Sequence, residues 1–255
     1  MDAYEKVVNA RSKERSISKE IIDNLFDEYF YVKGDRAFGD SQAIIGGLGE
    51  LDKYTLTFIG IQKGHEMDEA IKTNFGMPEP HGYRKAIRLM KAAEKFKRPL
   101  ITFVDTPGAY PGVEAEERGQ HQLIADCLMT MAGLRVPSLA FIIGEGGSGG
   151  ALALALANKI YMGEGAVFSI LSPEGFSSIL YKNKSRAKEA ADLMRLTAKD
   201  LYEDKIIDGI VGEADNKIKI SDLKRIILED LKYYSKLSSD KILRDRHEKF
   251  RRIGV

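Results

Sequence analysis

The sequence is poor in cysteine, tryptophan and histidine: its 255 residues include one Cys, no Trp and four His. A single cysteine, Cys127, excludes an internal disulfide framework and a cysteine-rich zinc site, and the apolar helical pattern around it predicts a buried thiol. Neither sign of charge dominates, because 39 Lys and Arg face 38 Asp and Glu. The resulting net charge of +1 indicates neither a nucleic-acid nor a membrane-surface partner.

Long apolar runs are also missing. The longest, Ala151–Ala157, is too short to cross a bilayer. Residues 1–20 are charged throughout and lack the apolar core of a signal peptide. These features predict a cytoplasmic protein that holds no metal.

What is present suits one α/β domain with helical ends, since 44% of the residues are hydrophobic and no linker or repeat interrupts the chain. Apolar residues at helical spacing predict a helical arm over residues 1–33, with Ser18 as an N-cap. The main domain then occupies residues 34–255. Its expected strands are Ala43–Leu48, Tyr54–Ile61, Leu100–Val104, Ser138–Ile143, Lys159–Met162 and Val167–Leu171. Its expected helices are Tyr83–Phe96, a single helix over 114–133, one that follows Gly150, one after Ser172-Pro173, Ala187–Leu196, Ala198–Lys205, Leu223–Tyr234 and Lys241–Arg252.

Two glycine-rich loops follow two of these strands. The first is Asp105–Gly112, and the second places five glycines in Gly144–Gly150, directly before an Ala/Leu helix. Loops at the carboxyl ends of neighbouring strands are where open α/β folds bind ligands. Because the first N–H groups of a helix have no partner within it, the second loop predicts an anion or oxyanion site made of main chain.

Three motifs overlap on this second loop, and a turn with only a packing role is the plain alternative. Gly144-x-Gly146-x-x-Gly149, with Glu164 further on, matches a dinucleotide fingerprint. Gly146-x-Ser148-x-Gly150 matches a hydrolase nucleophile elbow, which requires a histidine downstream, and only His247 lies there, among alternating charges. A backbone oxyanion hole requires no side-chain nucleophile or base, and the loops offer none, so this interpretation is favoured.

Seven ordered stretches resemble the carboxyltransferase α subunits of bacterial multi-subunit acetyl-CoA carboxylase, and the resemblance covers roughly residues 20–213. These stretches are Gln62–Gly64, Asn74–Pro78, Gly82–Ala86, Thr106–Val113, Ala115–Gln120, Ile143–Leu152 and Ser172–Gly175. The resemblance implies a crotonase-like fold, a spiral of ββα units flanked by N- and C-terminal helices. It also implies transfer of CO2 from carboxybiotin, carried on the biotin carboxyl carrier protein, to acetyl-CoA, giving malonyl-CoA for fatty acid synthesis.

The resemblance further implies partners and site residues. A β subunit bearing a zinc ribbon completes the active site in an α2β2 assembly, and biotin carboxylase and ATP binding belong to the larger complex. The amides of Gly149 and Gly150 are the expected oxyanion hole, for the ureido oxygen of biotin, which itself takes the methyl proton. The expected wall of the biotin and CoA cleft consists of Thr106, Pro107, Gly108, Ala109, Tyr110, Gly112, Gly146, Gly147 and Ser148.

Several positions keep two interpretations. Arg84, Lys85 and Arg88 are candidates for contact with CoA phosphates, and a solvated helix face is the alternative. Lys63 is a candidate for contact with a phosphate, and a solvated loop lysine is the favoured interpretation. A non-catalytic partner subunit of the same fold, or a nucleotide-binding α/β enzyme, is the alternative function. The five glycines argue against a mere scaffold, and a bulky residue at Gly150 is expected to abolish activity without disturbing the fold.

Overall fold

The computed structural model describes residues 1–254, which form one main sheet in the order β1-β2-β3-β4-β5-β6-β8, with β7 paired to β5. The strands β1 to β3 are antiparallel, and β3 to β6, β7 and β8 are parallel to their neighbours. A small second sheet pairs β9 with β10. The strands are β1 Glu28–Tyr31, β2 Ile44–Leu51, β3 Tyr54–Ile61, β4 Leu100–Thr106, β5 Ser138–Gly147, β6 Lys159–Gly163, β7 Val167–Ser169, β8 Gly209–Val211, β9 Glu213–Ala214 and β10 Lys217–Ile218.

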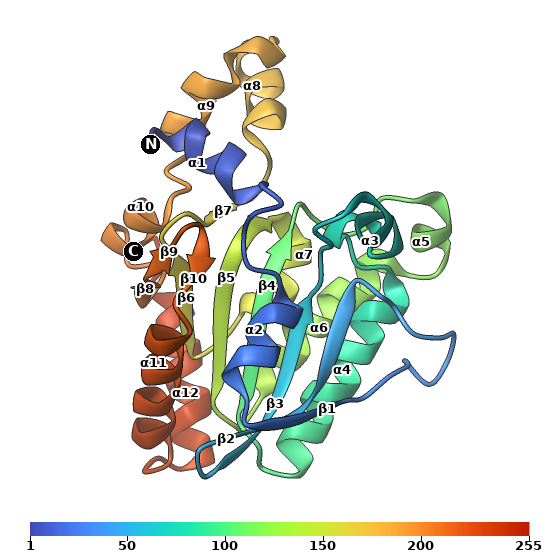
Figure 1. Ribbon diagram of the computed structural model, residues 1–255, viewed down its shortest axis with the longest axis vertical. Coiled ribbons are helices and arrows are strands. Elements are labelled where there is room, and N and C mark those ends of the chain that lie inside the picture. The colour runs from blue at the N-terminus through green and yellow to red at the C-terminus, as the bar shows by residue number, and fades with distance from the viewer. Residues whose placement is uncertain (255) are drawn as a thin grey trace.

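Helices cover both faces of this sheet (Figure 1). The α-helices are α1 Ala3–Ala10, α2 Ser18–Leu25, α3 Met67–Lys72, α4 Pro80–Lys95, α5 Val113–Glu117, α6 Gln120–Gly133, α7 Ser148–Ala155, α8 Pro173–Tyr181, α9 Ala187–Met194, α10 Ala198–Glu203, α11 Ile220–Tyr234 and α12 Ser239–Arg251. Two 3-10 turns, η1 Asn74–Gly76 and η2 Lys184–Arg186, lie between them. Within residues 1–254, no helix has both the length and the apolar character that crossing a membrane requires.

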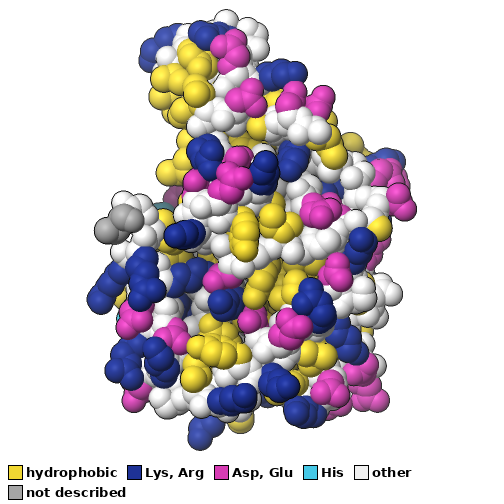
Figure 2. Space-filling model, turned by 90° about the vertical axis from the view of Figure 1, so that its left-hand side faces the viewer, with side chains coloured by type: hydrophobic (Ala, Val, Ile, Leu, Met, Phe, Trp, Pro, Cys, Tyr) yellow, Lys and Arg dark blue, Asp and Glu magenta, His cyan; other side chains and the backbone are white. Residues whose placement is uncertain are grey.

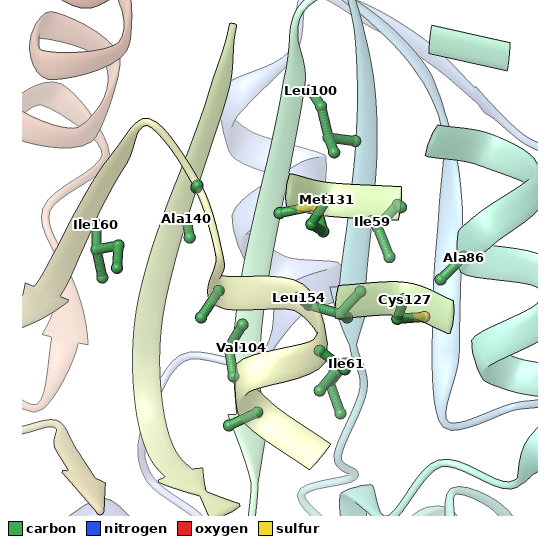
Figure 3. Packing of buried hydrophobic residues seen from close by; sticks show 14 of the residues in the cluster. Ile59, Ile61, Ala86, Leu100, Val104, Cys127, Met131, Ala140, Leu154 and Ile160 are labelled. Carbon is green, nitrogen blue, oxygen red and sulfur yellow. The ribbon is translucent and has the colours of Figure 1, made fainter. Parts of the chain in front are cut away.

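Two hydrophobic cores follow from the alternation of side chains along the parallel strands. In β5, Ala140 and Ile142 point into a core shared with α4, α6 and α7, whereas Leu139 and Phe141 point into a core shared with α2 and α11. Figure 3 shows the first core, in which Leu154 of α7 lies near Cys127 of α6. The prediction of a buried Cys127 is therefore confirmed.

The helices α1, α8 and α9 form a lobe that projects beyond the carboxyl ends of the strands (Figure 1). Val7 and Ala10 of α1 pack against Ala191 of α9, together with Val167 and Leu196. The helix α8 begins at Pro173, as predicted, and Ser172 caps it: the Ser172 side chain accepts a hydrogen bond from the Gly175 N–H at 3.1 Å. Because α1 packs against α9, the N-terminal arm docks on its own chain.

The structure corrects the sequence prediction at three places. The arm is not helical throughout residues 1–33, because β1 pairs with β2 as an edge strand. Ser18 is the first helical residue rather than the cap, and its hydroxyl donates to the Ile61 carbonyl at 2.7 Å. The expected helix over 114–133 is divided into α5 and α6, because Gly119 adopts a left-handed conformation with φ of 80°.

Candidate active site

The two predicted glycine loops lie side by side at the carboxyl ends of β4 and β5, where Thr106 pairs with Gly146. A register shift between Val104 and Thr106 sends the first loop across the second. Thr106 is fully buried and closes the first loop on itself: its hydroxyl donates to the Gly108 carbonyl at 2.7 Å and accepts from the Gly108 N–H at 3.0 Å.

The glycines of the second loop allow this close approach. A β-carbon at Gly147 would lie 2.2 Å from the Pro107 carbonyl oxygen, and one at Gly150 would lie 2.5 Å from the Ala109 nitrogen. The structure therefore brings residues 106–109 together with Gly146–Gly150, as predicted for one site. Tyr110 and Gly112 lie further along the first loop, where the Tyr110 N–H donates to the Pro78 carbonyl at 3.1 Å.

Gly149 differs from the other glycines of the turn. A β-carbon there would meet only a methyl group of Ile124, at an ordinary contact distance of 3.6 Å. By contrast, a β-carbon at Gly144 would lie 2.4 Å from the Asp105 carboxylate, and one at Gly146 would lie 2.8 Å from the Phe168 ring. Packing within this chain thus accounts for four of the five glycines and leaves Gly149 without a packing reason.

The strand β5 turns into α7 at Ser148, whose backbone is left-handed with φ of 54°. Such a conformation costs a non-glycine residue about 1–2 kcal/mol, and it is common at functional turns. Gly149 and Gly150 follow in the first turn of the helix, where N–H groups have no intrahelical acceptor. Ser148 is exposed, Gly149 is half-buried and Gly150 is buried, so Gly149 lies at the open end of the turn.

The nucleophile-elbow interpretation of Ser148 finds no support in the hydrogen bonds. All four histidines lie within residues 1–254, and each is bound elsewhere: His65 to Glu20, His81 near Glu79, His121 to Glu116 and His247 to the Ala132 carbonyl. The dinucleotide interpretation requires the fingerprint after the first strand, whereas here it ends the fifth. A turn that presents main-chain donors and a turn with only a packing role are the two interpretations that remain.

A network of charged residues that sequence analysis missed surrounds the turn. The Asp105 carboxylate accepts a hydrogen bond from the Glu145 N–H at 2.9 Å and forms an ion pair with the Lys63 ammonium at 2.6 Å. The expectation of a solvated Lys63 is therefore wrong, since the end of β3 brings it to Asp105. The Glu145 side chain in turn binds Arg11 of the N-terminal arm.

A pocket of about 520 Å³ opens beside this network, between the arm, α3 and the ends of β3 to β5. Asp105 and Pro107 of the first loop and Glu145 of the second contribute to its wall. Its remaining lining residues are Arg11, Ser12, Lys13, Arg15, Ile17, Lys63, Gly64, His65, Glu66, Met67, Ala70 and Phe75. The pocket is thus lined by both charged and apolar side chains.

The three cations predicted for CoA phosphates lie on α4 and hold residues 33–41 of this chain. Arg84 pairs with Asp35 at 2.7 Å, buried Lys85 pairs with Asp40, and Arg88 donates to the Gly34 carbonyl at 2.6 Å. The alternative of a solvated helix face does not describe Lys85, because this side chain is buried. The phosphate contacts stay a prediction, for which these groups would have to exchange partners.

Comparison with known proteins decides the family. A family model described as acetyl co-enzyme A carboxylase carboxyltransferase-like matches residues 1–254. This chain belongs to that family. The acetyl-coenzyme A carboxylase carboxyl transferase subunit alpha of Clostridium perfringens strain SM101 is 52% identical over 259 residues, covering 99% of this chain and 96% of the relative.

A second relative from this family joins two subunits. The acetyl-coenzyme A carboxylase carboxyl transferase subunits beta/alpha of Clostridium tetani are 48% identical over 260 residues, covering 100% of this chain and 45% of the relative. The α part of that protein therefore shares its polypeptide with a β part, which indicates a carboxyltransferase β subunit as partner of the α-type chain.

Solved structures confirm the predicted crotonase-like fold. Transcarboxylase 12S, with methylmalonyl-coenzyme A and methylmalonic acid bound, superposes with a TM-score of 0.74 at 19% identity, covering 88% of this chain and 42% of that one. A Pseudomonas malonate decarboxylase hetero-tetramer in complex with coenzyme A superposes with a TM-score of 0.69 at 18% identity, covering 82% and 86%. Both likenesses concern the fold of the chain.

Proposed function

We propose that this chain is the α subunit of an acetyl-CoA carboxylase, and that with a β subunit it transfers CO2 from carboxybiotin to acetyl-CoA, giving malonyl-CoA for fatty acid synthesis. The family and the names of the relatives support this activity. The observation that carries the chemistry is the turn into α7, where the first-turn N–H groups of Gly149 and Gly150 lie beside the 106–109 loop. We place the enzyme in the cytoplasm.

The main-chain donors of this turn suit a reaction that develops negative charge on an oxygen. When carboxybiotin, delivered as a substrate on its carrier protein, gives up CO2, charge develops on the ureido oxygen. Two preorganised N–H donors would stabilise it, and removal of one such donor costs about 3–4 kcal/mol where this has been measured. In this proposal biotin accepts the methyl proton of acetyl-CoA, so the reaction requires no side-chain base from this chain.

A β subunit supplies the rest of the active site in this proposal, within an α2β2 assembly served by the carrier protein and biotin carboxylase. The projecting lobe offers a surface for a subunit: Ile179 and Leu180 of α8 and Leu193 of α9 are 67%, 50% and 61% exposed. Hydrophobic side chains gather on this lobe in Figure 2. Contiguous exposed apolar patches on soluble proteins often mark contacts with a partner protein.

The alternative function is a non-catalytic partner subunit with the same fold. The number of glycines does not argue against it, because packing within the chain accounts for four of the five. Gly149 does argue against it, because a helical glycine with room for a side chain sacrifices about 0.5–1 kcal/mol relative to alanine. Close approach of a substrate to the backbone would explain that sacrifice.

Gly149→Val in the complex with the β subunit separates the two functions. The β-carbon of the valine has room in the free chain and its methyl groups would cover the donors. We therefore expect kcat to fall about 100-fold, in the range of lost oxyanion donors, with little change in melting temperature. Gly133→Val is the matched control, since Gly133 ends α6 with open space around it and lies away from the turn. Full activity of Gly149→Val would favour the non-catalytic subunit.

A further inference from the structure

The N-terminal arm crosses β5 immediately before the glycine turn and binds it at two points. Arg15 is buried and donates to the Ile143 carbonyl at 2.8 Å, while it pairs with Glu213 at 2.6 Å. Arg11, four residues earlier in the chain, donates from Nε and Nη2 to Glu145 Oε1 at 3.0 and 2.9 Å. Residues 11–15 are therefore fixed to the strand that leads into the turn.

Glu145 is held from two sides. Its side chain, 12% exposed, binds Arg11, and its N–H donates to the Asp105 carboxylate of the first loop at 2.9 Å. Gly146 and Gly147 follow directly and carry no side chain that could anchor them. The backbone of residues 145–147 also pairs with β7. Because oxyanion donors must be held within about 0.5 Å of the productive position, the anchoring of residue 145 contributes to where the donors point.

Arg11 also ties this point to the lobe. Its Nη1 donates to Glu174 Oε1 at 3.0 Å, and Glu174 lies in the first turn of α8. The Tyr4 hydroxyl of α1 donates to the same oxygen at 3.3 Å. The Arg11 guanidinium thus links Glu145, in β5, to the first turn of α8 in the lobe.

We propose that Arg11 is a positioning residue: through Glu145 it holds the Gly146–Gly150 turn in register with the first loop, and through Glu174 it couples that turn to the lobe. The role rests on the proposed carboxyltransferase function of the turn. It makes the N-terminal arm part of the site rather than only a docking segment. A planar guanidinium suits this role, because it reaches two carboxylates at once from a fixed fork.

The test uses Arg11→Met and Glu145→Gln in the complex of α and β subunits, with kcat, the KM for acyl-CoA, melting temperature and co-purification measured for each. We expect kcat to fall about 10- to 100-fold, as a small misplacement of reacting groups does, with the KM for acyl-CoA unchanged. The double variant should be no worse than Arg11→Met alone, because Arg11→Met already breaks the contact that Glu145→Gln weakens.

Lys188→Met is the matched control, because the Lys188–Asp2 pair at 2.7 Å also fastens the arm to α9 but touches neither loop. Its kcat should equal that of the wild type. Equal loss of kcat in Lys188→Met and Arg11→Met, or loss of melting temperature alone, would reduce Arg11 to a docking contact and overturn the positioning role. If Arg11→Met fails to fold, Glu145→Gln decides by the same criteria. An inactive wild-type complex would overturn the proposed function and this role together.

Discussion

At the scale of single residues, neighbouring glycines of the turn have opposite surroundings. Gly150 is wedged between the Gly108–Ala109 backbone and the Tyr83 hydroxyl, whereas Gly149 faces open space and Ile124. The sequence-based expectation that a bulky residue at Gly150 would spare the fold is therefore wrong, since backbone atoms cannot move aside as a flexible side chain can.

Gly150→Val should consequently destabilise the chain. Its β-carbon would overlap the first loop, and relieving the overlap would displace either the loop or α7, at a cost of about 1–3 kcal/mol typical of overpacked sites. Urea denaturation of the isolated chain measures this loss. A stability equal to that of Gly149→Val would contradict the close packing of the two loops.

At the scale of elements, buried cations join segments that are distant in sequence. Arg246 of α12 is fully buried and donates to the carbonyls of Leu134 and Val136, at 2.6 and 3.1 Å, just beyond α6. It also reaches Asn158 Oδ1 at 2.5 Å. Burial lowers the pKa of Arg246 to about 10, so the guanidinium remains charged at neutral pH.

Arg246→Met should destabilise the chain by about 3 kcal/mol or more, because several buried acceptors would lose their donor at once. Arg244→Met, on an exposed position of the same helix, is the control and should change stability by less than about 0.5 kcal/mol. Urea denaturation compares the two. Similar stabilities would show that α12 does not depend on the buried guanidinium.

The segment 33–41 depends on Asp35 and should be acid-sensitive. Burial would raise the pKa of Asp35, but N–H donors of residues 37–39 and the Arg84 guanidinium hold it well below the ordinary value of 3.8. The charged form therefore stabilises the fold fully above pH 3.8, and this contribution is lost as the pH falls below 3.8 toward the lowered pKa.

Asp35→Asn lacks this contribution at every pH. Its melting temperature should lie below that of the wild type at about pH 5, and the difference should shrink at about pH 3. Thermal melts of the two proteins over this range measure the change. A difference that stays constant or grows on acidification would contradict the role of the Asp35 carboxylate.

At the scale of the whole molecule, local sequence patterns predicted the fold but not the contacts between residues that are distant in sequence. The β2–β3 hairpin, the Ser172 cap and the two loops at strand ends follow from alternation, capping chemistry and glycine placement within short windows. The short edge strand β1 continues an apolar spacing that also fits a helix, so only pairing with β2 reveals it.

The charged network of the site could not be predicted in the same way. Arg11 and Glu145 are 134 residues apart, and Lys63 and Asp105 are 42 apart, so no sequence window contains both partners. A lysine before a glycine and an arginine in a charged arm are typical of solvated surface. These residues become neighbours only because the ends of β3, β4 and β5 lie next to the N-terminal arm in the folded chain.

In the proposed function, this chain and a β subunit share one carboxyltransferase site. The most direct measurement assays carboxyl transfer between malonyl-CoA and biotin, or biotin on its carrier protein, with the purified α chain, the β subunit and their co-purified complex. We expect activity in the complex and none in either chain alone. Activity of the isolated α chain, or an inactive complex, would contradict it.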